Sequence, residues 1–225
     1  GKEALDLFDS LVSVAPSSAE YKSNRGNAKL SLGLVDEAIK DFDDALSLNP
    51  RETGALLNRS VTLFQKNMVN DALADIERLL SLEPSSIDGW TNKAFMLLQQ
   101  NRVREADEIF SRLNNIAPNH PAALRLGIEL AWKNLNLDAA REYCQRGLNL
   151  FPQDPRFAFN LAISEMQAGR KNSALDRVKS MISVGTRELG VRPFLLGASI
   201  LAQNDQVADC ERWLHAALTQ NPECE

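Results

Sequence analysis

The sequence predicts an all-α fold built from stacked pairs of antiparallel helices, and three observations support this prediction. Prolines recur at one constant interval, at Pro50, Pro84, Pro118 and Pro152, and such a regular period is typical of helical repeat proteins. Small residues recur at the eighth and twentieth positions of most of these units. An apolar stripe with i, i+4, i+7 spacing starts at the twentieth position, as expected for one face of a helix.

The prolines mark where the second helix of each pair must end, because proline lacks a backbone N–H and disfavours helical geometry in the preceding residue. The opening residues fit the second helix of a truncated unit, with Ala4, Phe8 and Leu11 on its apolar face. We therefore expect the chain to be cut from a longer protein. Alignment on the prolines gives this truncated unit and six further units, at 1–18, 19–52, 53–86, 87–120, 121–154, 155–190 and 191–225.

The eighth and twentieth positions are expected to meet where the two helices of a pair cross, because close approach leaves no room for bulk. The eighth positions are Gly26, Ser60, Ala94, Ile128 and Ala162, and the twentieth positions are Ala38, Ala72, Ala106, Ala140 and Ala174. Ile128 is the large exception. Thr186 replaces the proline of its unit, and the register slips by two positions after Gly185. This slip predicts a longer turn at 185–192.

These units resemble the tetratricopeptide repeat. Residues 19–52 match its pattern at Gly26, Ala38, Phe42, Ala45 and Pro50, and residues 87–120 match it at Trp90, Ala94, Ala106, Phe110 and Pro118. The resemblance covers nearly the whole chain. It implies a right-handed solenoid, an α-α superhelix whose first helices line a concave groove. It also implies a protein-interaction scaffold that binds an extended peptide or a helix of a partner protein in that groove.

The sixth position holds an asparagine in four of five units, at Asn24, Asn58, Asn92 and Asn160. This row is similar to the asparagine ladder of the tetratricopeptide superhelix attached to O-linked N-acetylglucosamine transferases. An asparagine amide has one acceptor and two donors, so it can pair with both polar groups of a ligand peptide unit. The alternative is that each amide bonds a neighbouring turn of its own chain.

Apolar residues at the fifth, ninth and twelfth positions form a second stripe on the first helices, which predicts buried anchors for a ligand. The alternative is that the twelfth position packs into the adjacent unit, which would account for Phe64 and Trp132. The residues expected to bind a peptide are Asn24, Asn27, Asn58, Val61, Asn92, Phe95, Gln99, Phe159, Asn160 and Ile163.

Cations occupy the seventh position of three consecutive units, at Arg25, Arg59 and Lys93. Such a row could bind an acidic or phosphorylated segment. However, Asp41 and Asp75 follow the two arginines at one shared spacing, on the partner helix of the same unit. This spacing favours structural ion pairs within units, and Lys93 lacks the equivalent carboxylate.

Some tetratricopeptide domains clamp the terminal carboxylate of chaperone tails with lysine, arginine and asparagine side chains. Asn27 and Asn58 match that pattern, but Ser23, Asp88 and Asn92 stand where cations are required. The resemblance therefore argues against a co-chaperone role.

Composition argues against other classes of function. The net charge is −5, from 25 basic and 30 acidic residues without a long basic run, so no nucleic-acid partner is expected. The three cysteines and two histidines lack metal-site spacing, and we expect no metal or other cofactor. No catalytic motif is found, and no apolar stretch is long enough for membrane insertion. The compartment stays open, with the cytoplasm favoured.

Three hypotheses stay open. The leading one is the peptide-binding scaffold. The second is a targeting or regulatory module of a larger enzyme, such as a glycosyltransferase-like protein. The third is self-association into a homo-oligomer, in which the helix expected at residues 3–15 docks onto a second copy of the chain.

Overall fold

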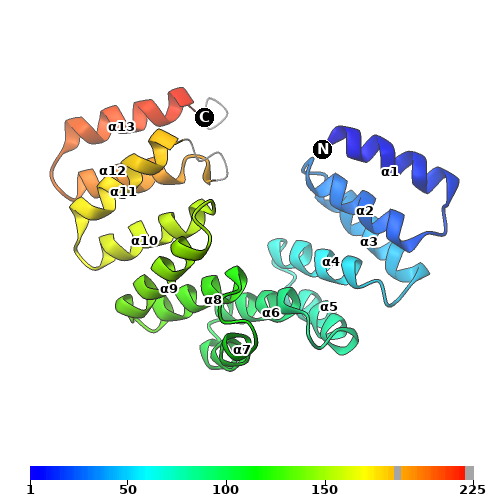
Figure 1. The fold of residues 1–225 in the computed structure, drawn as a ribbon. Helices are drawn as coiled ribbons and strands as arrows, with labels where there is room; N and C mark the ends of the chain where they lie inside the picture. The colour runs from blue at the N-terminus through cyan, green and yellow to red at the C-terminus, as the bar shows by residue number, and fades with distance from the viewer. Residues whose placement is uncertain (185–188, 221–225) are drawn as a thin grey trace. The chain divides into compact units, whose positions relative to one another are not determined.

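A computed structural model describes residues 1–184 and 189–220, and these residues form helices joined by short turns without any strand (Figure 1). The predicted all-α fold is confirmed. The helices are α1 (Lys2–Val14), α2 (Ala19–Leu30), α3 (Val35–Leu48), α4 (Thr53–Gln65), α5 (Val69–Leu82), α6 (Ile87–Gln99), α7 (Val103–Ile116), α8 (Pro121–Lys133), α9 (Leu137–Leu150), α10 (Pro155–Gln167), α11 (Lys171–Val184), α12 (Arg192–Ala202) and α13 (Val207–Gln220).

The chain divides into two compact units, Gly1–Ile109 and Phe110–Glu225, with the boundary inside α7. In the first unit each helix from α1 to α6 packs on the next one along the chain, and the alternate helices α2, α4 and α6 are also neighbours. In the second unit α8 to α13 pack in the same sequential way, and α10 also contacts α12. Each unit is therefore a stack of helix pairs.

The second helices end where the prolines predict. Helices α3, α5, α7 and α9 each stop shortly before Pro50, Pro84, Pro118 and Pro152. The following helices begin with side-chain caps in several pairs. The Ser18 hydroxyl accepts a hydrogen bond from Tyr21 N–H, and the Asp154 carboxylate accepts one from Arg156 N–H. Such caps satisfy backbone donors that the first helical turn leaves unpaired.

The turn between the two helices of each pair contains one residue in the left-handed region of backbone space. These residues are Gly33, Asn67, Asn101, Leu135, Gly169 and Asp205, with φ between 56° and 76°. Glycine and asparagine adopt this conformation readily at the end of a helix, whereas a leucine is strained there. Leu135 is also 85% exposed.

The apolar stripe of the second helices forms the core. Ala38, Phe42 and Ala45 of α3 are completely buried, as are Ala72 and Ile76 of α5. The predicted meeting of small residues needs one revision, because a Cβ added at Gly26 would lie 2.7 Å from the Phe42 ring, which is its nearest neighbour. Position eight thus makes room for a large residue at position twenty-four.

At Ile128 the sizes are reversed, with a large residue at position eight and a small one at position twenty-four. Ile128 is completely buried in one cluster with Cys144, the residue at position twenty-four of the same unit. A small side chain there compensates for the large one on α8, so close packing is preserved.

Part of the predicted long turn at 185–192 lies outside the described residues, which exclude 185–188 and therefore Gly185 and Thr186. The turn resumes at Leu189 and leads into α12. The unit boundaries at 155–190 and 191–225 stay predictions. None of the described helices has the length and apolar character needed to cross a membrane.

Candidate functional site

The predicted peptide-binding residues fall into two groups, one in each unit. In the first unit, Asn24 and Asn27 lie on α2, Asn58 and Val61 on α4, and Asn92, Phe95 and Gln99 on α6. Because α4 contacts both α2 and α6, the structure brings these three helices together. In the second unit, Phe159, Asn160 and Ile163 all lie on α10.

The four asparagines at position six are half-buried. The main-chain oxygens of Asn58 and Asn160 accept hydrogen bonds from Thr62 and Ser164, at 2.7 and 2.9 Å. Within residues 1–184 and 189–220, however, no hydrogen bond engages the side-chain amide of Asn24, Asn58, Asn92 or Asn160. The alternative that these amides bond neighbouring turns therefore has no support in the described structure.

Some apolar residues of the predicted site also pack against the hydrophobic core. Phe159 and Ile163 are half-buried and pack against a cluster formed by α10, α11 and α12. Val61 and Phe95 are also half-buried, whereas Asn27 and Gln99 are exposed. The α10 side chains thus offer a ligand only part of their surface.

The twelfth position packs as its structural interpretation predicts. Phe64 lies against the core of the first unit. Trp132 of α8 packs against the cluster that contains Phe157 and Leu161 of α10, and its indole N–H donates to Ser164 Oγ at 3.1 Å. The Trp132 ring therefore joins two adjacent helix pairs.

The cations at position seven are held by ion pairs, which confirms the structural interpretation. Arg25 donates to both carboxylate oxygens of Asp41, at 2.6 and 2.8 Å. Arg59 forms the same pair of bonds with Asp75, at 2.6 and 2.7 Å. Both carboxylates are buried, so neither arginine is free to bind an acidic ligand.

Each of these cations also reaches back to the preceding helix pair, which the sequence analysis missed. Arg25 Nη1 lies 3.2 Å from Asp9 of α1, and Arg59 Nη1 lies 2.6 Å from Asp43 of α3. Lys93 Nζ lies 3.0 Å from Glu77 of α5. The acid precedes the cation at the same spacing each time, whereas the predicted pairs involve only acids that follow it. We call these contacts the ion-pair ladder.

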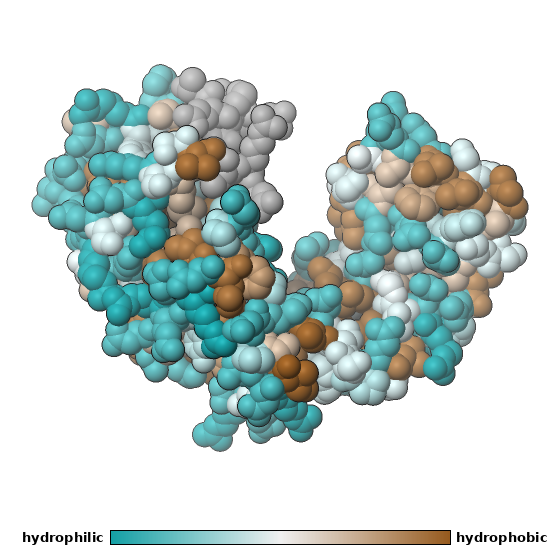
Figure 2. All heavy atoms as spheres, viewed as in Figure 1, coloured by the Kyte–Doolittle hydropathy of each residue, from teal (hydrophilic) through white to brown (hydrophobic). Residues whose placement is uncertain are grey.

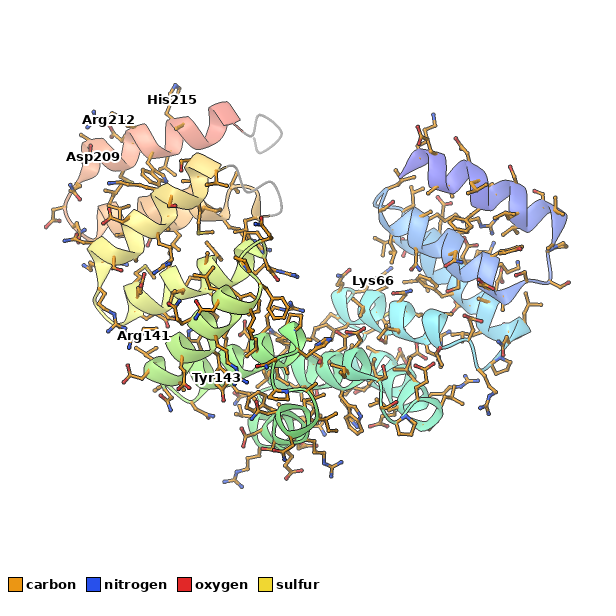
Figure 3. The ribbon with its side chains drawn as sticks, viewed as in Figure 1. Lys66, Arg141, Tyr143, Asp209, Arg212 and His215 are labelled. Carbon is orange, nitrogen blue, oxygen red and sulfur yellow. The ribbon has the colours of Figure 1, made fainter. Side chains whose placement is uncertain are left out.

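Electrostatics within the ladder favour ionised carboxylates. Burial alone would raise the pKa of Asp41, but hydrogen bonds from Arg25 and Lys29 outweigh it and hold that pKa below its usual value. Lys66, labelled in Figure 3, adds another ion pair between neighbouring pairs, with Asp36 of α3. Ion pairs therefore connect neighbouring helix pairs throughout the first unit.

Two hollows of the second unit lie away from the predicted residues. One follows α9 and has a volume of about 1040 Å³, with the labelled Arg141 among its lining residues (Figure 3). The other has about 430 Å³, with apolar walls that include Leu175 and Phe194 and a rim that includes Arg212. Trp213 lines it too, and its buried indole N–H has no hydrogen-bond partner among the described residues.

Exposed aliphatic residues recur at the last residue of second helices. Figure 2 shows hydrophobic residues among hydrophilic ones on the face in view. The most exposed are Val14, Ile116 and Val184, at 86%, 76% and 81%. They share one position of the repeat period with Leu48, Leu82 and Leu150.

Comparisons with known proteins agree with this architecture. A family model described as the tetratricopeptide repeat matches residues 2–53, 23–87 and 126–178. A comparison with curated protein sequences finds no match. Among solved structures, a tetratricopeptide repeat protein from Parabacteroides merdae is 16% identical, with a TM-score of 0.79 over 96% of this chain and 85% of that chain.

Two further solved structures share the fold. PilW, a type IV pilus biogenesis factor, is 22% identical, with a TM-score of 0.74 over 92% of this chain and 94% of that chain. YrrB, a tetratricopeptide repeat protein with an unusual peptide-binding site, is 16% identical, with a TM-score of 0.55 over 93% of this chain and 100% of that chain. The family model covers more than half of the sequence, and the structural likeness extends over both units. The chain belongs to the tetratricopeptide repeat family.

Proposed function

We propose that this chain is a protein-interaction scaffold that binds an extended segment of a partner protein along its first helices. One observation carries the proposal. Asn24, Asn58 and Asn92 repeat at the same position of three neighbouring helices, half-buried and without hydrogen bonds to their amides among the described residues. These amides are therefore not used by the fold, and the peptide groups of an extended ligand would supply both a donor and an acceptor for each of them.

Magnitudes require apolar anchors beside the amides. Each hydrogen bond contributes about 0.5 to 1.5 kcal/mol net, whereas association costs roughly 4 to 15 kcal/mol. Three asparagines alone would therefore bind weakly. Val61 and Phe95 lie one helical turn after Asn58 and Asn92, and burying such side chains contributes about 1.5 to 3 kcal/mol each. The combination is consistent with micromolar affinity, about −8 kcal/mol.

The likeness to YrrB supports the proposal, because that protein has the same fold and a peptide-binding site. The family itself is one of protein-interaction scaffolds. The identity of the partner is a separate question, which binding experiments must answer.

The test is peptide binding by wild type and by the double variant Asn58→Ala, Asn92→Ala. A peptide array identifies ligands, and fluorescence anisotropy then measures Kd. Loss of two amide contacts should weaken binding by about 5- to 150-fold. The matched control is Asn70→Ala, which changes an exposed asparagine at the start of α5. An unchanged Kd in the double variant would contradict the proposal.

Self-association is a second candidate, favoured by the apolar face of α1. Leu7 is 57% exposed, and Phe8 and Leu11 are only half-buried. The corresponding residues of α3, Phe42 and Ala45, are completely buried. We expect light scattering to show a concentration-dependent dimer that Leu7→Glu abolishes. A monomer at every concentration would exclude this candidate.

A further inference from the structure

Nearly every carboxylate that the protein partly buries has a polar partner. Asp41 and Asp75 are bonded by arginines of the ladder. Glu165 accepts two hydrogen bonds from Arg177, at 3.1 and 3.2 Å, and Asp154 accepts two from Arg156, both at 2.7 Å. The half-buried Asp44, Glu52 and Asp209 also have partners.

Glu129 of α8 is the exception among the described residues. Its side chain is half-buried, and it forms no hydrogen bond or ion pair with any residue that the structure describes. Burial raises the pKa of Glu129, and the charge of Lys133 offsets this only in part. A carboxylate that is partly desolvated and has no partner gains more from a nearby positive charge than a fully solvated one does, so the site favours a positively charged group from elsewhere.

Two contacts of α8, one with the N-cap residue of α10 and one with α10 itself, indicate which side of α8 carries this carboxylate. One turn before Glu129, Arg125 Nη1 approaches Asp154 at 3.8 Å. One turn after it, Trp132 donates to Ser164. Residues one turn apart share a face of a helix, so Glu129 belongs to the side of α8 that meets α10. Figure 1 shows both helices in the second unit.

Asn160 lies on the same stretch of α10, between Asp154 and Ser164. Its main-chain oxygen accepts from Ser164, and its side-chain amide has no hydrogen bond within the described residues. An unpaired carboxylate on α8 and an unpaired amide on α10 thus lie on two helices whose side chains are in contact.

We propose that Glu129 binds a lysine or arginine side chain of the partner segment, while Asn160 bonds the main chain of that segment. This inference rests on the proposed function and adds the chemistry of one ligand position. It assigns a basic residue to the part of the segment that crosses from α8 to α10. The contact is a charge-assisted hydrogen bond in a partly dry setting, where such bonds are strong.

The negative charge of Glu129 and the lack of further metal-coordinating side chains favour a basic side chain over an acidic group or a metal ion. Residues 1–184 and 189–220 contain no cluster of three or more histidine, cysteine or acidic side chains that could hold a metal. Arg125 is already engaged by Asp154. An acidic ligand would be repelled by Glu129. A single carboxylate beside an amide suits one ammonium or guanidinium group.

The experiment is a positional scan of a bound peptide, in which each residue is replaced in turn by lysine, arginine or norleucine. At one position, wild type should prefer lysine or arginine to norleucine by at least about tenfold. Glu129→Gln should bind the norleucine peptide as wild type does and lose the preference. Glu142→Gln, which alters an exposed glutamate of α9, should keep it. Thermal melting checks that both variants fold, and Glu129→Gln should melt no lower than wild type because it removes a poorly solvated charge.

The outcomes separate this inference from the proposed function. If peptides bind and Asn160→Ala weakens them, but no position prefers a basic residue, the inference is wrong and the scaffold function stands. If Glu129→Gln keeps the preference, another residue provides it and the inference is also wrong. If wild type binds no peptide, both fail together. Glu129→Lys provides a final check, since it should reverse the preference toward glutamate at the same position.

Discussion

Leu135 offers a direct measure of backbone strain in the turn of a helix pair. It has a φ of 56° and is 85% exposed, so its substitution loses almost no buried surface. A left-handed conformation costs an L-residue about 1 to 2 kcal/mol. Glycine removes this strain but loses about 0.5 to 1 kcal/mol more through conformational entropy on folding. Leu135→Gly should therefore stabilise the protein by up to about 1.5 kcal/mol.

Urea titration followed by circular dichroism measures the change, and Leu135→Ala is the control. Alanine removes the exposed side chain but keeps the strain, so its midpoint should stay close to that of wild type. The reverse change, Gly33→Leu, should destabilise by a similar amount, because φ is 75° there and no atom lies within 4 Å of an added Cβ. If Leu135→Gly lowers the midpoint, or Leu135→Ala raises it equally, the argument from strain is wrong.

Three further predictions concern packing and charge. Gly147→Ala should lower the free energy of unfolding in urea by up to about 2 kcal/mol. The added methyl group overlaps the buried Phe157 ring, and this overlap outweighs a gain in helix propensity of about 1 kcal/mol. Ala106→Leu should cost about 1 to 3 kcal/mol, since Ala106 is completely buried; an unaltered melting curve would contradict the assigned register. The lowered pKa of Asp41 means that its pairing with Arg25 stabilises the fold above the ordinary value of 3.8 and is lost as pH falls through the lower folded value. Stability measured from about pH 6 to about pH 2 should fall in this window, and Asp41→Asn should flatten that decline.

The regular parts of the fold were predictable because they depend on a period. A helix that approaches a proline must stop before it, so the proline spacing located the ends of α3, α5, α7 and α9. Five of the six left-handed turn residues are glycine, asparagine or aspartate, the types that adopt this conformation most readily. The position was missed because Leu135 breaks that pattern and the repeat was aligned on its prolines and small residues.

The candidate site was predictable only where it repeats. The amides of Asn58 and Asn92 stood out by their spacing, and the structure adds that they lack hydrogen bonds among the described residues. Glu129 gave no such signal, because a single glutamate at the ninth position resembles any solvated residue of an amphipathic helix. Its burial and its missing partner depend on how α8 meets α10, which spacing along one helix does not reveal.

The ion-pair ladder has a consequence for how the first unit unfolds. In a linear repeat protein, cooperativity depends on the energy of each junction between neighbouring repeats. Arg25 and Arg59 each bind one carboxylate of their own pair and one of the pair before it. Opening one pair therefore removes a counter-ion from its neighbour, so each such contact adds up to about 1 kcal/mol to a junction and couples the unfolding of adjacent pairs.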